Sequence, residues 1–306
     1  MVESVDLRRL QVLRVVHECG TVTAAAGLLH LTPSAVSHQL RQLSREVGVP
    51  LLERTGRLVR LTPAGLRLVG HADELHARWE QARADVGGAV EEESGPLRMA
   101  GFPTAVAALL APAAAQLREE HPRLEVHVSE VETVDGFGRL LAGEVDLAVV
   151  VPTFGTPPLN SRKFHQELLL EEPLDLLVPA GHRLAGAETV SLTEVARDPW
   201  VLAARGSCDF YELVQAACTA AGFNPEVVHH AKDVVAIFAL VAHGLGVALT
   251  PRLTAVHPHP GVHRVSLGGT PQPSRRLTAC VRRGSEDQPV IKRGLDSLRV
   301  AASRCG

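Results

Sequence analysis

The stretch Thr32–Val47, with the sequence TPSAVSHQLRQLSREV, constrains the fold of this 306-residue chain more than any other. A helix is predicted to begin here, because the Thr32 hydroxyl can cap it and Pro33 suits its first position. Apolar residues then recur at steps of four, three and four, which places them on one stripe of the helix. That stripe consists of Val36, Leu40, Leu43 and Val47.

The other side of this helix carries five side chains able to donate or accept hydrogen bonds. They are Ser34, Ser37, His38, Arg41 and Arg45. A buried stripe opposite a short polar face with two arginines suits a helix seated in the major groove of DNA. An ordinary surface helix with a solvated face would show the same pattern, so the neighbouring segments must decide.

The segments before this helix predict a helix-turn-helix. Leu7–Val16 has the apolar spacing of a first helix, which Gly20 would end. Thr21 can cap a short second helix whose three consecutive alanines allow close packing, and a tight turn leads on to Thr32. In such a motif Thr21 and Thr23 would hold phosphates, and Arg41 is the best candidate for a bidentate contact with guanine. Thr32 and Pro33, at the start of the second helix of the motif, are further candidates for DNA contact.

Two short extended runs around Thr55-Gly56 predict a β-wing after the helix-turn-helix. The wing would offer Arg54, Arg57 and Arg60 to phosphates or to the minor groove. Residues 1–62 contain eight Arg and five Asp or Glu and so carry +3, while the whole chain carries −3 and the remainder −6. A basic head on an acidic body indicates that the first domain alone meets phosphates.

A longer helix is predicted from Thr62-Pro63 to Gly87-Gly88, where the linker EEESGP follows. Its apolar positions alternate steps of four and three, which is the seam of a coiled coil. We predict that this arm forms a dimer through Leu68, Ala72, Leu75, Trp79, Ala82 and Val86.

The order of these parts resembles the LysR-type transcriptional regulators. The matching stretches are AGLLHLTPSAVSHQLRQL and VGVPLLERTGRLVRLTPAG, followed by the arm. The chain departs from the family pattern at Ser44, where Glu is habitual, and at Leu52, where Phe is usual; neither change removes a proposed DNA contact. The resemblance implies a regulator of transcription that binds a dyad-related promoter site as a homodimer, assembled further into a homotetramer.

From Leu97 onward, strands alternate with helices, which predicts βαβ units and a parallel sheet. The first unit has strands at 97–101, 124–131 and 146–151 with helices at 104–120 and 133–142. The second has strands at 174–184, 199–204, 225–230 and 246–251, a capping box from Ser191 to Glu194, and helices at 209–221 and 232–243. A strand at 276–282 and a helix at 289–302 would return to the first unit.

This layout is similar to that of periplasmic binding proteins, with crossings near 160–168 and 263–270 and a ligand cleft between two lobes. LAGEVDLAVVV and GVALTP resemble two further signatures of the LysR family. We therefore expect an α/β fold with a winged helix-turn-helix at 1–62, a linker helix and linker at 63–94, and an effector-binding domain at 95–306. Lobe I would comprise 95–165 and 268–306, and lobe II 166–267.

Ligands of open α/β sheets bind beyond the carboxyl ends of the strands. This rule selects Phe102, Pro103, Thr104, Thr133, Ala203, Arg205, Ser207 and Thr250 as effector contacts. Arg205 is the only fixed positive charge among them, so a carboxylate effector is one hypothesis. The alternatives are that the two threonines at 104 and 133 only cap helices and that Arg205 is a solvated loop residue.

Competing functions have weaker support. Cys208 and Cys218 have a separation similar to the cysteine pair of peroxide-sensing family members, although Cys218 fits a buried helix position as well. The prolines among His257, His259 and His263 spread these side chains apart, so we expect neither metal nor cofactor. Neither a nucleophile elbow nor a phosphate loop is present, which argues against an enzyme. A solute-binding module that has lost DNA affinity remains open.

No stretch reaches the ~20 apolar residues of a membrane span, and the start lacks the features of a signal peptide. We therefore expect a cytoplasmic protein that is not bound to a membrane.

Overall fold

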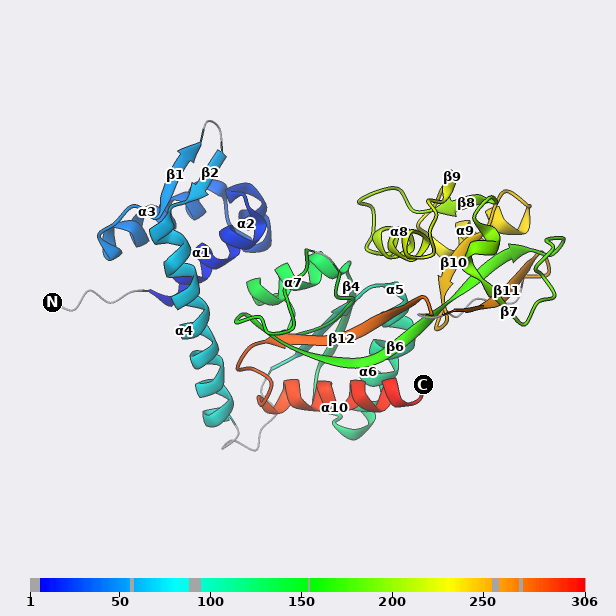
Figure 1. The fold of residues 1–306 in the computed structure, drawn as a ribbon. Coiled ribbons are helices and arrows are strands. Elements are labelled where there is room, and N and C mark those ends of the chain that lie inside the picture. The colour runs from blue at the N-terminus through cyan, green and yellow to red at the C-terminus, as the bar shows by residue number, and fades with distance from the viewer. Residues whose placement is uncertain are drawn as a thin grey trace.

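The N-terminal head of the computed structural model is a winged helix-turn-helix (Figure 1). The structure describes residues 6–55, 58–87, 95–153, 155–254, 259–269 and 272–305. The head comprises α1 (Leu7–Cys19), α2 (Val22–Leu28), α3 (Pro33–Val47), β1 (Leu52–Thr55) and β2 (Leu58–Leu61). Side chains start these helices as the sequence predicts, since the hydroxyls of Thr21 and Thr32 accept hydrogen bonds from Ala24 and Ala35.

The apolar stripe of α3 anchors this helix in the core of the head. Val36, Leu40 and Leu43 are completely buried. The prediction was wrong for Val47, which is 36% exposed because it is the last residue before the left-handed Gly48 and lies beyond the core. One face of α3 is therefore fixed, and the opposite face is left to solvent.

Helix α4 (Pro63–Gly87) leaves the head and extends beyond it (Figure 1). The Thr62 hydroxyl accepts a hydrogen bond from the Gly65 N–H and donates one to the Pro50 carbonyl, at 3.0 and 2.8 Å. Gly65 allows the close approach of the preceding loop, because a Cβ at this position would lie 2.4 Å from the Leu51 carbonyl oxygen. The start of the helix is thus held tightly against the head.

Lobe I contains a sheet in the order β4-β3-β5-β12-β6. The strands β3 (Leu97–Gly101), β4 (Val126–Glu130) and β5 (Leu147–Val150) are parallel, and β12 (Ser274–Arg282) is antiparallel to β5. Helices α6 (Ala111–Glu120) and α10 (Pro289–Ser303) pack on one face, whereas α7 (Thr133–Ala142) packs on the other. A short helix α5 (Pro103–Ala105) and a π-helical turn at Val106–Leu110 precede α6.

Lobe II contains the other part of the same sheet and a small additional sheet. Its elements are β7 (Thr189–Ser191), a 3-10 turn (Leu192–Val195), β8 (Pro199–Leu202), α8 (Phe210–Ala220), β9 (Glu226–His230), α9 (Val234–Ala242), β10 (Ala248–Pro251) and β11 (Val262–Gly268). The predicted capping box at Ser191 and Glu194 is present. The core of this lobe surrounds the fully buried Trp200.

A single strand, β6 (Phe164–Pro179), passes through both lobes. Residues 164–173 pair with β12 in lobe I, and residues 174–179 pair with β10 and β11 in lobe II. The first crossing is therefore at Pro173, later than the expected 160–168, and the return lies between β11 and β12. Opposite charges face each other across β6 and β12, with Arg275 opposite Glu172 and Arg276 opposite Glu171. This pairing of opposite charges stabilises the first half of β6, which was not predicted as a strand because it contains many charged residues.

The head packs directly against lobe I. Side chains of α1, α2 and α7 share one apolar core, and Leu28 of α2 lies against Gly138 of α7. The Gln11 side chain donates a hydrogen bond to the Leu141 carbonyl, and Lys163 forms an ion pair of 2.6 Å with Glu18. The head is thus held on lobe I by direct contacts as well as by the linker. No helix among the described residues could span a membrane.

Candidate DNA-binding face and inter-lobe cavity

The polar face of α3 is open to solvent. Ser34, His38 and Arg41 are exposed, and Ser37 is half-buried. The hydroxyls of Thr32 and Ser34 form a hydrogen bond of 2.9 Å at the start of the helix. Among the described residues, Arg41 has no hydrogen-bond or ion-pair partner. Its guanidinium group is therefore available to an external acceptor, as contact with a base edge requires.

The predicted backbone contacts lie around this face. Thr21, Thr23 and Pro33 are exposed, as is Arg60, which faces Glu53 across the two strands of the wing. The side chain of Arg54 and all of Arg57 lie outside the described residues. The starts of α2 and α3 and strand β2 of the wing thus lie at the surface, where they could contact DNA.

The predicted seam of α4 divides into two parts. Ala72 is buried and Leu68 half-buried, and both pack against the core of the head. The later seam positions are exposed and have no apolar cover among the described residues. They are Leu75, Trp79, Ala82 and Val86.

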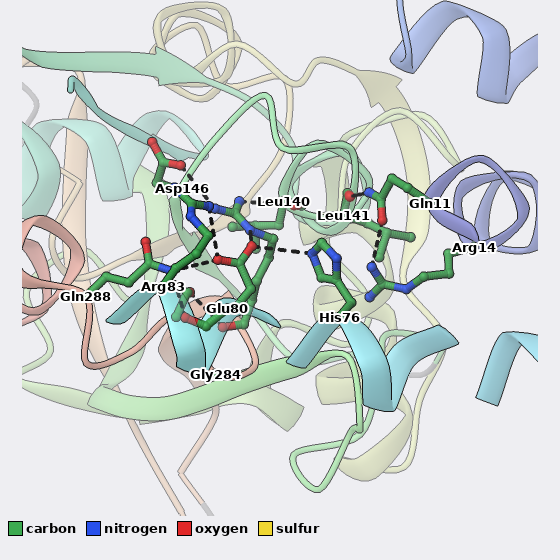
Figure 2. Close-up of polar contacts among 12 residues, drawn as sticks. Gln11, Arg14, His76, Glu80, Arg83, Leu140, Leu141, Asp146, Gly284 and Gln288 are labelled. Carbon is green, nitrogen blue, oxygen red and sulfur yellow. Dashed lines mark hydrogen bonds and ion pairs between the residues drawn. The ribbon is translucent and has the colours of Figure 1, made fainter. Parts of the chain in front are cut away.

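Glu80, on the other side of α4, lies buried against lobe I (Figure 2). Its carboxylate accepts hydrogen bonds from Arg282 at 2.9 Å and from Gln288 at 2.6 Å, and His76 lies 3.3 Å away. Burial raises the pKa of Glu80, but these three partners outweigh burial and lower it to about 2. The sequence analysis missed this residue, because a lone Glu on a long helix normally lies in water.

Arg282 joins this carboxylate to the end of α7. It donates hydrogen bonds to the carbonyls of Leu140 and Val145 at 3.3 and 2.7 Å, and it pairs with Asp146 at 3.2 Å. Nearby, Gly284 has φ +88°, and a Cβ there would lie 2.2 Å from the Ala77 carbonyl of α4. The arm is consequently docked on lobe I of its own chain.

A cavity of about 240 Å³ lies between the two lobes. Five of the predicted effector residues line it: Phe102, Pro103, Thr104, Ala203 and Thr250. Apolar side chains from both lobes form most of the remaining wall: Val151, Leu177, Val201, Leu202, Phe210, Leu213, Val234, Ile237, Phe238, Leu249 and Pro251. This position, between lobes and beyond strand ends, is the one that the sheet topology predicts.

The other three predicted residues do not line the cavity. The Thr133 side chain is buried, with its hydroxyl accepting from the Val151 N–H, and its own N–H donates to Asp209 across the cleft at 2.7 Å. Ser207 is half-buried and Arg205 is exposed. The carboxylate hypothesis therefore loses the side chain on which it was based.

The cavity also contains polar residues that the sequence analysis missed. Arg275 is buried, donates to Glu172 at 2.7 Å and to the Thr104 hydroxyl at 2.6 Å, and lies over the ring of Phe102. Thr254 lines the wall as well. Charged residues within two otherwise apolar strands could have drawn attention to Arg275 and Glu172. That the two side chains form a pair, however, follows only from the register between β6 and β12.

The cysteines differ in their surroundings. Cys208 is half-buried and lines the cavity, whereas Cys218 packs in the core of lobe II. Burial raises the pKa of the Cys218 thiol to about 12, so it is not a thiolate near neutral pH. Within the described chain, no three His, Cys, Asp or Glu side chains gather as a metal site would require; His257 lies outside it.

A winged helix-turn-helix, a long helix and a two-lobed domain with an internal cavity together define a ligand-responsive DNA-binding regulator. Comparisons with known families agree. Residues 7–66 match the bacterial regulatory helix-turn-helix protein of the lysR family, and residues 91–303 match the LysR substrate binding domain. The chain belongs to the LysR family of transcriptional regulators.

Individual relatives span most of the chain. It is 31% identical to the transcriptional dual regulator GltC of Bacillus subtilis over 250 residues, 81% of each chain. It is 28% identical to the DNA-binding transcriptional dual regulator OxyR of Escherichia coli, over 81% of this chain and 79% of OxyR. Among solved structures, a full-length OxyR variant of Pseudomonas aeruginosa gives a TM-score of 0.64 at 23% identity, covering 97% and 95%. Full-length BenM gives 0.61 at 23%, covering 99% and 98%.

Proposed function

We propose that this regulator reads a dyad-related promoter site through α3 and responds to a small molecule in the inter-lobe cavity. The observation that carries the DNA-binding half is the free guanidinium of Arg41 in the middle of an exposed polar face. An arginine of this kind can make two parallel hydrogen bonds to the O6 and N7 atoms of guanine. Ser34, Ser37 and His38 would support that contact.

The remaining polar groups would fix the position of the head on the duplex. Thr21, Thr23, Thr32 and Pro33 would lie beside phosphates, and the arginines of the wing at 54, 57 and 60 would follow the backbone or the minor groove. These contacts contribute affinity without reading the sequence.

A homodimer would bring two heads to the two halves of the site. The exposed part of the seam, Leu75 to Val86, supports this assembly because it presents an uncovered apolar stripe at coiled-coil spacing. Leu68 and Ala72 would contribute indirectly, by seating the arm on the head. We propose a homotetramer of two such dimers, acting in the cytoplasm without enzymatic activity.

Helix α7 supports a physical link between the cavity and the head. Its first residue, Thr133, contacts Asp209 of lobe II at the cleft. Its last turn contacts Gln11 of the head and Arg282, the partner of Glu80 on the arm. A ligand that changes the angle between the lobes would therefore act on both ends of this helix.

A mobility-shift assay tests the DNA-binding half, with the full-length protein and the DNA upstream of its own gene. A shift that unlabelled DNA of the same sequence abolishes, and that unrelated DNA does not, supports the proposal. A protein that folds but gives no specific shift would instead be a solute-binding module.

Peroxide sensing through Cys208 and Cys218 is the second candidate. Cys208, in the cavity wall, favours it, whereas the raised pKa of Cys218 opposes it. Counting free thiols before and after peroxide treatment decides between the two, because a sensor of this type would lose two thiols together.

A further inference from the structure

We propose that the inter-lobe cavity takes a small apolar molecule bearing an ammonium group, held between Glu132 of lobe I and Asp209 of lobe II. This inference rests on the proposed function of the cavity as the effector site, and it names the chemical class of the effector. It replaces the carboxylate that Arg205 had suggested.

The size and walls of the cavity define the body of the ligand. An apolar cavity of about 150 Å³ accepts benzene, so 240 Å³ has room for one ring and a short substituent. Phe102, Phe210 and Phe238 stand among the aliphatic side chains of the wall. Burial of an apolar body against them supplies most of the affinity.

The charges around the cavity disfavour an anion. Four carboxylates line it, those of Glu130, Glu132, Asp209 and Asp233, against two cations, Lys232 and Arg275. Arg275 does not count toward a ligand, because its charge is compensated by the buried Glu172. Glu130, Asp233 and Lys232 are exposed, and Asp233 already accepts two N–H groups at the start of α9, whereas Glu132 and Asp209 are half-buried.

Glu132 and Asp209 are the pair with the greatest need for positive charge. Asp209 precedes α8 in lobe II, and its carboxylate accepts the N–H of Thr133, the first residue of α7 and the neighbour of Glu132. Lys232 reaches Glu132 only at 3.4 Å. Burial, followed by repulsion from Asp209, raises the pKa of Glu132. An ammonium group between the two carboxylates would relieve this repulsion and join the lobes.

Two hydroxyls in the same cavity give independent evidence of a polar ligand. Thr250 and Thr254 are 3% and 5% exposed, and their Oγ1 atoms have no hydrogen-bond partner among the described residues. Leaving a buried hydroxyl unpaired costs free energy, which a hydrogen-bonding group of a ligand would recover. A purely apolar ligand would leave both unpaired.

Three compounds of matched shape test the proposal on the full-length protein: cyclohexylmethylamine, cyclohexylmethanol and cyclohexanecarboxylate. Titration calorimetry should show the amine binding at least about tenfold more tightly than the carboxylate. Preference for the carboxylate or the alcohol overturns the ligand class but leaves the cavity as an effector site. No binding of any of the three overturns the ligand class and counts against the proposed use of the cavity.

Variants then locate the ammonium group. Glu132→Gln and Asp209→Asn should each weaken amine binding about fivefold or more and leave the alcohol unaffected. Glu226→Gln removes the same charge from an exposed position outside the cavity and should change neither. Lys232→Met should strengthen amine binding, because it frees Glu132. Weaker amine binding in Lys232→Met would contradict the proposal, since a site built for anions would respond in that way.

Discussion

At the scale of single residues, Arg41 and Arg60 separate two kinds of DNA contact. Both side chains are exposed, but Arg41 lies on the recognition helix and Arg60 on the wing. A base contact carries sequence information, whereas a phosphate contact carries only affinity. Removing the two arginines should therefore have different effects on DNA binding.

We predict that Arg41→Ala loses about 1–3 kcal/mol of specific binding and relaxes the preference at one base pair of each half-site. Arg60→Ala should weaken binding to all sequences and reduce the slope of affinity against salt by about one ion. Binding titrations on the site and on single-base variants, at several salt concentrations, check this. Identical behaviour of the two variants would show that the division of roles is wrong.

Glu80 gives a prediction about acid stability. Its pKa is lowered from 4.5 to about 2 in the folded chain, so its stabilising contribution is complete above 4.5 and is lost as the pH falls toward 2. Glu80→Gln should lower the free energy of unfolding by about 3 kcal/mol at pH 7. The gap to the unmodified protein should close between pH 4.5 and 2.

Urea denaturation at a series of pH values measures this gap. Glu119→Gln, at an exposed position of α6, is the control and should show no gap at any pH. A gap for Glu80→Gln that stays constant down to pH 2 would mean that the effect comes from packing rather than from charge.

Local chemistry was predictable from sequence at this scale, and long-range pairing was not. The caps at Thr21, Thr32 and Ser191 depend on neighbours within three residues, and all three were found. The pairs Arg275–Glu172 and Arg282–Glu80 join residues about one hundred and two hundred positions apart. Such partners are brought together only by strand register and helix docking.

At the scale of elements, two glycines in α4 should respond oppositely to alanine. A Cβ at Gly65 would meet the Leu51 carbonyl, whereas a Cβ at Gly70 would meet nothing within 4 Å. Gly65→Ala should destabilise the chain by about 1–3 kcal/mol, and Gly70→Ala should stabilise it by up to about 1 kcal/mol. Denaturation followed by circular dichroism checks both signs; stabilisation by Gly65→Ala would mean that the loop moves away freely.

The exposed face of the same helix gives a second prediction. Trp79 and Leu66 are 52% and 49% exposed, but thirteen residues at 100° per residue place them about 140° apart around α4. Trp79→Glu should weaken the dimer by about 2 kcal/mol or more, because it removes a large apolar side chain from the proposed interface. Leu66→Glu should leave association unchanged. Sedimentation equilibrium measures both, and equal weakening would place the interface elsewhere.

Most elements of the fold were predicted within a few residues, because their apolar periodicity is strong. The strands β7 and β11 were not expected, and β11 lies where a crossing between the lobes was expected. The first half of β6, FHQELLLEEP, was not expected either, because it lacks a clear alternation of apolar and polar residues. The strand conformation of this half comes from its partner β12 in the sheet rather than from its own pattern. The strand propensity of its residues alone cannot identify a strand that forms because of its neighbours in the sheet.

At the scale of the whole molecule, the contacts at both ends of α7 lead us to predict that a change at the cleft alters the stability of the head. Asp209→Asn weakens the contact with Thr133 at the start of this helix, whereas Asp233→Asn alters a side chain that lines the same cavity but hydrogen-bonds to the start of α9. The first variant should increase amide hydrogen exchange in α1 about fivefold, and the second should not.

Mass spectrometry of hydrogen exchange in the full-length protein measures this difference. In a Gln11→Ala background, the effect of Asp209→Asn should be smaller, because the Gln11–Leu141 hydrogen bond is lost and only the apolar packing between α1 and α7 remains. Equal exchange in the two aspartate variants would mean that the lobes and the head are not coupled through α7.

The passage of β6 through both lobes determines which motions the molecule can make. Its hydrogen bonds on either side of Pro173 would break if the halves slid apart along the strand, but a twist about the strand would preserve them. Pro173 has no N–H to contribute, so the ladder lacks one inter-strand hydrogen bond where the strand passes from one lobe to the other. Rotation displaces atoms in proportion to their distance from the axis. A turn too small to alter the cavity walls noticeably would therefore move the distant strands β1 and β2 through a much longer arc.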